Sequence, residues 1–292
     1  MERELWAWLM VGVRDVGRSF PDSAYHTHAT ALIVRVYLWA VLHDRPTRWA
    51  CEPRAWDRRT RPAALPSQPT MSRRLRQPAT AAFLRHLGRR LGGRIGPGLG
   101  LLKCIDGRPL TVARHSVDPD ATVGHAHGRS GRGYKLHLIE AGTPMPAAFA
   151  VEPLNVGEKA TARRLIPQLT GSGYLLGDAN YHANDLFDLA DQHGHRLLAP
   201  RERPYTGLGH RRHSPHRLDC LDRLEAAPRA GNRFAWWLMR RRDRVESTFA
   251  HLACFFAGLH QLPPWVRRLH RVRPYVHAKL LINAARIRHI HA

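Results

Sequence analysis

The sequence predicts an α/β fold in which a mixed β-sheet carries flanking helices and follows a small helical part at the N-terminus. In that N-terminal part, apolar residues recur at helical spacing, as in Ile33, Val34, Tyr37, Leu38 and Val41. After residue 100, short apolar runs of strand length appear, and further along they alternate with helical patterns. This order is typical of a sheet with helices packed on it.

A stretch rich in glycine and proline, residues 92–100, predicts a linker that divides the chain. We expect a helical region at residues 1–95 and a larger α/β domain at residues 100–292. Apolar residues make up 43% of the chain, which is enough for a hydrophobic core and argues against a disordered protein.

Within the N-terminal region, residues 67–76 predict a short helix with an arginine-rich surface. Ser67 or Thr70 can cap its first turn. Its apolar residues share one face, which leaves a basic face exposed, and a DNA-recognition helix has this appearance. The expected DNA contacts on this helix are Arg73, Arg74 and Arg76. Any short surface helix in an arginine-rich protein looks similar, so both interpretations stay open.

Three strands are expected to follow the linker as a meander. The first, at residues 101–105, ends at the turn dipeptide Asp106-Gly107, and residues 109–115 form the return strand. A loop rich in glycine and histidine, residues 124–133, leads to the third strand at residues 134–139.

Helices and strands then alternate towards the C-terminus. We expect helices at residues 158–169, 184–192, 234–259 and 266–289, and strands at residues 174–177 and 196–199. Between them, an irregular and basic insertion is expected near residues 201–232.

The charge of the chain predicts a polyanionic partner. There are 46 basic and 23 acidic side chains, a formal net charge of +23, and the basic residues run along the whole sequence. Nucleic acid is the first candidate partner. A ribosome-associated or merely soluble basic protein is the alternative.

The four cysteines form no Cys-x-x-Cys pair, which argues against a zinc ribbon or finger. The apolar stretches at residues 6–13 and 29–42 are too short to span a bilayer, and the N-terminus lacks the features of a signal peptide. We therefore expect a cytoplasmic protein with no membrane contact.

Three acidic residues are candidates for chemistry. Asp106 and Asp178 each follow an apolar strand, which would hold the carboxylate rigidly at the rim of the sheet. Glu246 borders the apolar stripe of a helix, with Arg242 one turn earlier. That stripe consists of Val245, Phe249, Leu252 and Phe256. A few carboxylates can bind hard divalent cations, and two ions about 4 Å apart serve phosphodiester chemistry. Taken singly, each acid is also explained as a turn residue or a surface ion pair.

Several ordered motifs resemble the bacterial insertion-sequence transposases of the DDE type, whose catalytic domain has a ribonuclease-H-like fold. The main matching segments are Ile105-Asp106-Gly107, Gly133-Tyr-Lys-Leu-His137, Gly177-Asp178-Ala-Asn-Tyr181 and Arg242-Asp-Arg-Val-Glu246-Ser-Thr-Phe249. Residues 262–267 and 278–283 also match, so the resemblance covers residues 100–288. It implies a ribonuclease-H-like catalytic domain at residues 100–292 and extends weakly to the helix at residues 67–76. The capped, arginine-rich character of that helix, ahead of the linker, predicts that residues 1–95 bind transposon-end DNA.

The resemblance also implies a mechanism. Asp106, Asp178 and Glu246 would bind two Mg²⁺ ions, with Mn²⁺ as a substitute. They would cleave the ends of an insertion sequence and join them to target DNA by phosphoryl transfer. The implied partner is double-stranded DNA, both transposon ends and target, bound by a homodimer at the nucleoid. A nuclease without strand transfer and a decayed DNA-binding repressor are the alternatives.

Further DNA contacts are expected at Arg242, Lys135 and Trp237. Trp236 and Trp237 precede the helix that carries Glu246, and an aromatic ring there could stack on a base extruded from the DNA end. For at least one of the two, core packing is the preferred interpretation. Many members of the family carry the signature Tyr-x2-Arg-x3-Glu-x6-Lys. Here Met239 stands at the Tyr position and Ala253 at the Lys position. This departure concerns contacts with the transposon end and leaves the metal ligands unchanged.

Two histidine-rich segments are weaker candidates. The run from His210 to His216 could hold a metal ion, but its flanking arginines would repel a cation, so a basic DNA-contacting loop is the preferred interpretation. His125 and His127 lie in the glycine-rich loop and are candidates either for phosphate contact or for a solvated loop.

Overall fold

The computed structural model describes residues 2–93, 100–113, 115–203, 206–209, 212–225, 233–254, 258–259 and 261–290. The chain divides into two compact units. One comprises Met1–Gly93, His115–Asp120 and His251–Ala292, and the other comprises Arg94–Arg114 and Ala121–Ala250. Most of the predicted linker, residues 94–99, lies outside the described residues, as do residues 226–232 of the predicted basic insertion.

The first unit is helical. Its elements are α1 (Glu2–Ser19), α2 (Thr30–Leu42), α3 (Thr47–Ala50), a 3-10 helix (Pro53–Ala55), α4 (Gln68–Arg74), α5 (Pro78–Gly92) and α11 (Leu269–Ile290). The apolar residues of α2 that predicted a helix are buried in the core. Ser67 caps α4 as expected, because its hydroxyl accepts a hydrogen bond from the backbone N–H of Thr70 at 3.4 Å.

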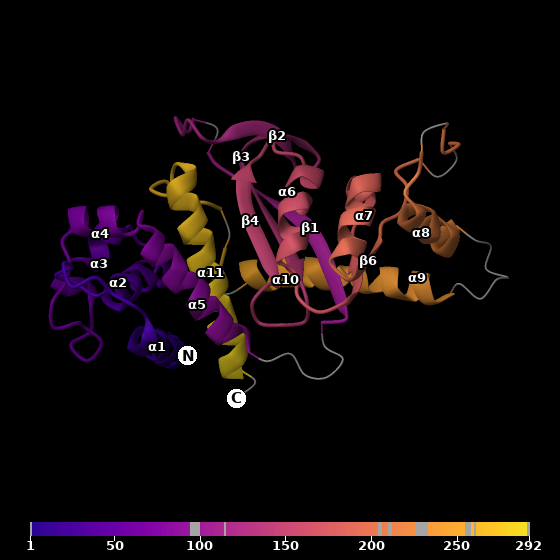
Figure 1. The fold of residues 1–292 in the computed structure, drawn as a ribbon. Coiled ribbons are helices and arrows are strands. Elements are labelled where there is room, and N and C mark those ends of the chain that lie inside the picture. The colour runs from indigo at the N-terminus through magenta and orange to yellow at the C-terminus, as the bar shows by residue number, and fades with distance from the viewer. Residues whose placement is uncertain are drawn as a thin grey trace. The chain divides into compact units, whose positions relative to one another are not determined.

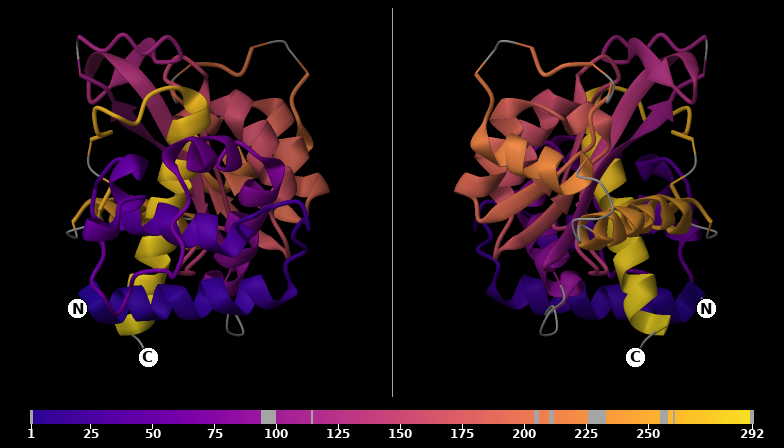
Figure 2. Two further views of the ribbon diagram at one scale, coloured as in Figure 1. Left: turned by 90° about the vertical axis from the view of Figure 1, so that its left-hand side faces the viewer. Right: turned by 90° about the vertical axis from the view of Figure 1, so that its right-hand side faces the viewer.

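The C-terminal helix α11 packs on α1, α2 and α5 (Figure 2). Residues 275–285 of this helix are all buried, as is typical of a helix inside a hydrophobic core. The fully buried ammonium of Lys279 binds the carboxylate of Asp44 at 2.6 Å. We expected residues 251–292 to belong to the α/β domain, whereas the compact unit groups them with the N-terminal helices.

The second unit contains a six-stranded mixed sheet. Its strands are β1 (Leu102–Thr111), β2 (Thr122–Ala126), β3 (Arg129–Glu140), β4 (Ala148–Pro153), β5 (Gly173–Leu176) and β6 (His195–Leu198). The central β1 is antiparallel to β3 and parallel to β5, β6 extends the parallel side, and both β2 and β4 pair with β3. The predicted fold class, a ribonuclease-H-like mixed sheet with flanking helices, is confirmed.

The chain does not turn at Asp106-Gly107, so that part of the prediction was wrong. β1 continues through both residues to Thr111. A glycine is needed here for packing: a Cβ at Gly107 would lie 3.0 Å from Cδ of Lys135 and 3.1 Å from Nδ1 of His137. The dipeptide therefore provides close approach between β1 and β3, which explains why a turn signal occurs inside a strand.

The glycine- and histidine-rich segment is a hairpin, where a loop was expected. It joins β2 to β3 through His127 and Gly128, whose φ angles are 51° and 78°. Positive φ at both central residues is the geometry of the tight turns that connect twisted antiparallel strands. The strand β4 was also missed, although the predicted third strand corresponds to the second half of β3.

The helices of the second unit lie on both faces of the sheet. They are α6 (Glu158–Leu165), α7 (Asn184–Gln192), α8 (Pro215–Glu225), α9 (Arg233–Met239) and α10 (Asp243–Ala253), with 3-10 helices at Ile166–Gln168, Ala179–Tyr181 and Arg240–Arg242. Figure 1 shows α6 and α7 on one face and α10 on the other. α8 forms within the stretch that we expected to be irregular, and the single helix expected over residues 234–259 is divided into α9 and α10.

Candidate active site

β1 places Asp106 on the face of the sheet that α10 covers. Side chains alternate along a strand, so Asp106 shares its face with Cys104 and Arg108. The guanidinium of Arg108 donates to the backbone carbonyl of Phe249 at 2.6 Å, and the thiol of Cys104 lies 3.6 Å from the carbonyl of Arg241. Asp106 itself accepts a hydrogen bond from the N–H of Gly107 at 2.7 Å.

β5 brings Asp178 to the same edge of the sheet. The parallel register of β1 and β5 ends at the pair Cys104–Leu176, and Asp106 and Asp178 each follow two residues later. Asp178 caps the next 3-10 turn by accepting hydrogen bonds from the backbone N–H and the side-chain amide of Asn180, at 2.9 and 3.1 Å. The two carboxylates are therefore fixed by backbone geometry.

The pKa shifts of Asp106 and Asp178 indicate that several acidic groups lie near one another at this edge of the sheet. The pKa of Asp106 is raised to about 6, first because the carboxyl is desolvated by burial and then because Asp178 and Glu158 are negatively charged. Burial and the charge of Glu158 also raise the pKa of Asp178. The Arg242 guanidinium opposes both shifts. Such a concentration of carboxylates favours the binding of a cation.

Glu158 is a member of this cluster that sequence reasoning missed. It lies in the first turn of α6, and its Oε1 accepts a hydrogen bond from Nζ of Lys135 at 3.0 Å. An acidic residue in the first turn of a helix is ordinary, since it complements the helix dipole. The sequence pattern alone therefore gave no signal that Glu158 joins Asp106 and Asp178.

Glu246 lies on α10, where the structure pairs it with Arg242. The Arg242 Nη2 to Glu246 Oε1 distance is 3.4 Å, and the Glu246 side chain is 62% exposed. Arg242 is thus the group that connects the predicted acids, since its charge also lowers the pKa values of Asp106 and Asp178. The apolar stripe predicted for this helix is buried at Val245, Phe249 and Leu252. Phe256 lies outside the described residues.

The chemistry of the donors suits a hard divalent cation, which prefers carboxylate oxygens. Oε2 of Glu158 and the hydroxyl of Tyr181 are buried without a hydrogen-bond partner among the described residues. Buried polar atoms of this kind need a partner. No group of three or more acidic, histidine or cysteine side chains in the described part of the chain is arranged to hold a metal ion. Glu246 bonds Arg242 instead of joining the two aspartates.

The expected DNA contacts near this site differ in accessibility. Trp237 is 49% exposed; its ring stacks on Phe234, and the Arg241 guanidinium lies 4.9 Å from the ring centroid. This exposure argues against the core-packing alternative. Trp236 is 53% exposed as well. Lys135, by contrast, is mostly buried in its ion pair with Glu158.

The arginines around α4 also differ from one another. Arg73 and Arg76 are exposed, as expected. Arg74 is buried at 2% exposure, and its guanidinium donates to the carbonyl of His28 and to Oγ1 of Thr30, both at 2.8 Å. The prediction that Arg74 contacts DNA is corrected, because the side chain is occupied in anchoring α4 to the start of α2.

The histidine-rich segments show no metal site in their described residues. His213 bonds the Arg217 guanidinium at 2.8 Å, and His216 lies 3.3 Å from the Asp191 carboxylate. His210 lies outside the described residues. His125 and His127 belong to the β2–β3 hairpin.

The fold and the acidic edge of the sheet define a ribonuclease-H-like protein with a candidate phosphoryl-transfer site. A family model described as the transposase DDE domain matches residues 98–262. This match spans more than half of the chain, and the chain belongs to that family. Searches of curated proteins and of solved structures found no significant match.

The part of the chain that the structure describes contains no helix with the length and apolar character needed to cross a membrane.

Proposed function

We propose that this DDE transposase cleaves the ends of an insertion sequence and joins them to target DNA, with Asp106, Asp178 and Glu246 as its catalytic acids. The observation that carries the proposal is the pair of aspartates on β1 and directly after β5. Neighbouring strands hold them at one edge of the sheet, where the pKa of Asp106 is raised to about 6. Perturbed carboxyl groups clustered at a strand edge are typical of catalytic sites.

The proposed cofactor is a pair of Mg²⁺ ions, replaceable by Mn²⁺, held by these three acids. When bound, such ions supply Lewis-acid activation of the nucleophile and charge stabilisation of the leaving oxygen. The chain's own residues fix the geometry: β1 and β5 hold the aspartates, and Asn180 orients Asp178 through two hydrogen bonds. Glu246 joins the aspartates when it leaves Arg242.

We propose two roles for Arg242, one when the site holds no cations and one when cations are bound. In the structure it partly neutralises the acidic cluster and binds Glu246. With cations at the carboxylates, the guanidinium is released to contact a phosphate of the DNA end. A positioned arginine beside the transferring phosphoryl group orients the scissile bond and offsets developing charge.

The proposed partners are double-stranded transposon ends and target DNA, bound by a homodimer at the nucleoid in the cytoplasm. The net charge of +23 supports this, since a strongly basic chain attracts the DNA backbone. Cutting two ends in one reaction supports the dimer.

The test is to join a pre-cleaved duplex, taken from the DNA that flanks the gene, to a supercoiled plasmid. The expected result is Mg²⁺-dependent joining. Glu246→Gln should abolish it, whereas the matched control Asp243→Asn, which removes one charge from the same helix, should not. Cutting without joining would identify a nuclease, and DNA binding without either reaction would identify a repressor.

A further inference from the structure

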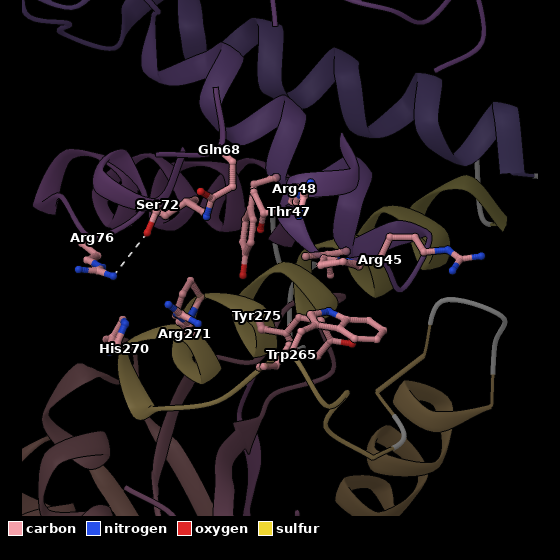
Figure 3. Close-up of a pocket in the computed structure, with 16 residues that line it drawn as sticks. Arg45, Thr47, Arg48, Gln68, Ser72, Arg76, Trp265, His270, Arg271 and Tyr275 are labelled. Carbon is pink, nitrogen blue, oxygen red and sulfur yellow. Dashed lines mark hydrogen bonds between the residues drawn. The ribbon is translucent and has the colours of Figure 1, made fainter. Parts of the chain in front are cut away.

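A basic cavity in the helical unit is separate from the candidate active site. It has a volume of about 200 Å³ and lies among α3, α4 and the start of α11 (Figure 3). Its cationic and aromatic lining includes Arg45, Arg48, Arg76, Trp265, His270 and Arg271. The lining therefore comes from two segments that are distant in sequence, residues 37–76 and 265–275.

The lining of this cavity is basic. None of its lining residues is acidic. Among the described residues, no carboxylate forms an ion pair with Arg45, Arg48, Arg76 or Arg271. Elsewhere in the same unit, surface arginines do have acidic partners, such as Asp15 for Arg90 at 2.9 Å. An unpaired group of arginines around a hollow is the arrangement expected of a site for a polyanion.

Three basic side chains gather at one end of the cavity. Figure 3 shows Arg76, on the α4 side, close to His270 and Arg271 of α11. Burial lowers the pKa of His270 first, the neighbouring charges of Arg76 and Arg271 lower it further, and the carboxylate of Asp120 opposes this shift. An anion bound between Arg76 and Arg271 would relieve the repulsion between their two charges.

The walls of the cavity are held rigidly, which reduces the entropic cost of binding. Asp118 and Asp120 accept hydrogen bonds from the backbone N–H groups of Arg268 and Leu269, at 3.0 and 2.8 Å, and so fix the start of α11. On the opposite wall, α4 is fixed by the buried guanidinium of Arg74.

Neutral donors and an aromatic surface complete the lining. The hydroxyl of Ser72 accepts a hydrogen bond from Arg76 at 3.4 Å, and Gln68 lies on the same wall. Trp265, which is 38% exposed, lies toward the end of the cavity marked by Arg45. Phosphate oxygens can accept hydrogen bonds from the basic and neutral donors, and the sugar face of a DNA strand can pack against the indole ring.

We propose that this cavity binds the sugar–phosphate backbone of duplex DNA, so that α3, α4 and residues 265–271 form one composite DNA-binding surface. Arg76 and Arg271 bind one phosphate, and Arg45 and Arg48 bind another further along the strand. The inference rests on the proposed transposase function and extends it, since residues 265–271 had no assigned role in DNA binding.

The test is fluorescence anisotropy with a labelled duplex over a range of salt concentrations. Each lost phosphate contact should reduce the slope of log affinity against log salt by about 0.9. Arg76→Ala/Arg271→Ala removes one phosphate contact, so it should weaken binding at least about tenfold at low salt and flatten the slope by about 1. The control Arg14→Ala/Arg89→Ala removes the same charge from exposed sites in the same unit and should change affinity about twofold or less, as expected of a general charge effect.

The outcomes separate this inference from the proposed function. Equal losses in the cavity and control variants, with unchanged melting temperatures, would overturn the composite surface while leaving the transposase proposal intact. Failure of the wild-type protein to bind any duplex would overturn both.

Discussion

Asp106→Asn should make the metal-free protein more stable at neutral and alkaline pH. The pKa of Asp106 is raised from 3.8 to about 6 because folding buries the carboxyl beside Asp178 and Glu158. A raised pKa in the folded state means that this group's stabilising contribution is complete below pH 3.8 and is lost as the pH rises through about 6. Above pH 6 the folded protein therefore holds an unfavourable buried charge.

The magnitude follows from the size of the pKa change. Each pKa unit corresponds to about 1.4 kcal/mol, so the full effect is about 3 kcal/mol. Because Asp106 is only partly buried, solvent screening reduces this to about 1–3 kcal/mol. An asparagine can still accept the hydrogen bond from the N–H of Gly107, so the substitution removes the charge and little else.

The assay is thermal unfolding with a chelator, at about pH 8 and about pH 4. At the higher pH, the variant should melt roughly 2 to 12 °C above the wild type. At the lower pH the folded carboxyl is neutral like the amide, so most of the difference should disappear. Added Mg²⁺ should stabilise the wild type, by about 2.7 kcal/mol at a hundred times its Kd, and not the variant.

Asp243→Asn is the matched control, since Asp243 is exposed on α10. Its loss should change neither the melting temperature at the two pH values nor the stabilisation by Mg²⁺. The reasoning is refuted if Asp106→Asn lowers the melting temperature at about pH 8. It is also refuted if Mg²⁺ stabilises both proteins equally, because the ion would then bind elsewhere.

Three further substitutions test individual side chains. Arg242→Ala should lower the cleavage rate at least about tenfold, which corresponds to about 1.4 kcal/mol in the barrier. Loss of the ion pair with the exposed Glu246 alone would be worth only about 0–1 kcal/mol. A wild-type cleavage rate at saturating DNA would exclude the phosphate role. Arg74→Ala should lower the free energy of unfolding by about 2–4 kcal/mol in denaturant unfolding, because it removes the donor to two buried acceptors. The exposed Arg73 should tolerate the same change, and equal effects at the two positions would contradict the anchoring role. Trp237→Ala should weaken the binding of cleaved-end duplex by about 1–3 kcal/mol with little change in melting temperature, because the side chain is exposed. An unaltered affinity would exclude stacking on a base.

The sequence predicted the fold class because its strongest patterns are local. The helix at residues 184–192 and the Ser67 cap follow directly from apolar periodicity and hydroxyl placement. The turn predicted at Asp106-Gly107 failed because Gly107 is required by the side chains of Lys135 and His137 on the neighbouring strand. Such a cross-strand requirement is not visible in the order of residues along one strand.

The candidate site was predicted only in part for the same reason. Asp106 and Asp178 follow apolar runs, so their placement beside the sheet could be inferred. Glu158 joins them only because α6 begins at that edge, and a glutamate in a first helical turn is common. The burial of Arg74 depends on the carbonyl of His28 and the hydroxyl of Thr30, which no local pattern links to α4.

The central claim is that Asp106, Asp178 and Glu246 act together in metal-dependent strand transfer. The most direct measurement is joining of a pre-cleaved end duplex to plasmid DNA by the wild type, Asp106→Asn, Asp178→Asn and Glu246→Gln. Each assay uses Mg²⁺ at DNA concentrations that saturate binding. The account predicts joined product only for the wild type, with equal DNA affinity for all four proteins. Near-normal joining by any of the three variants would contradict it.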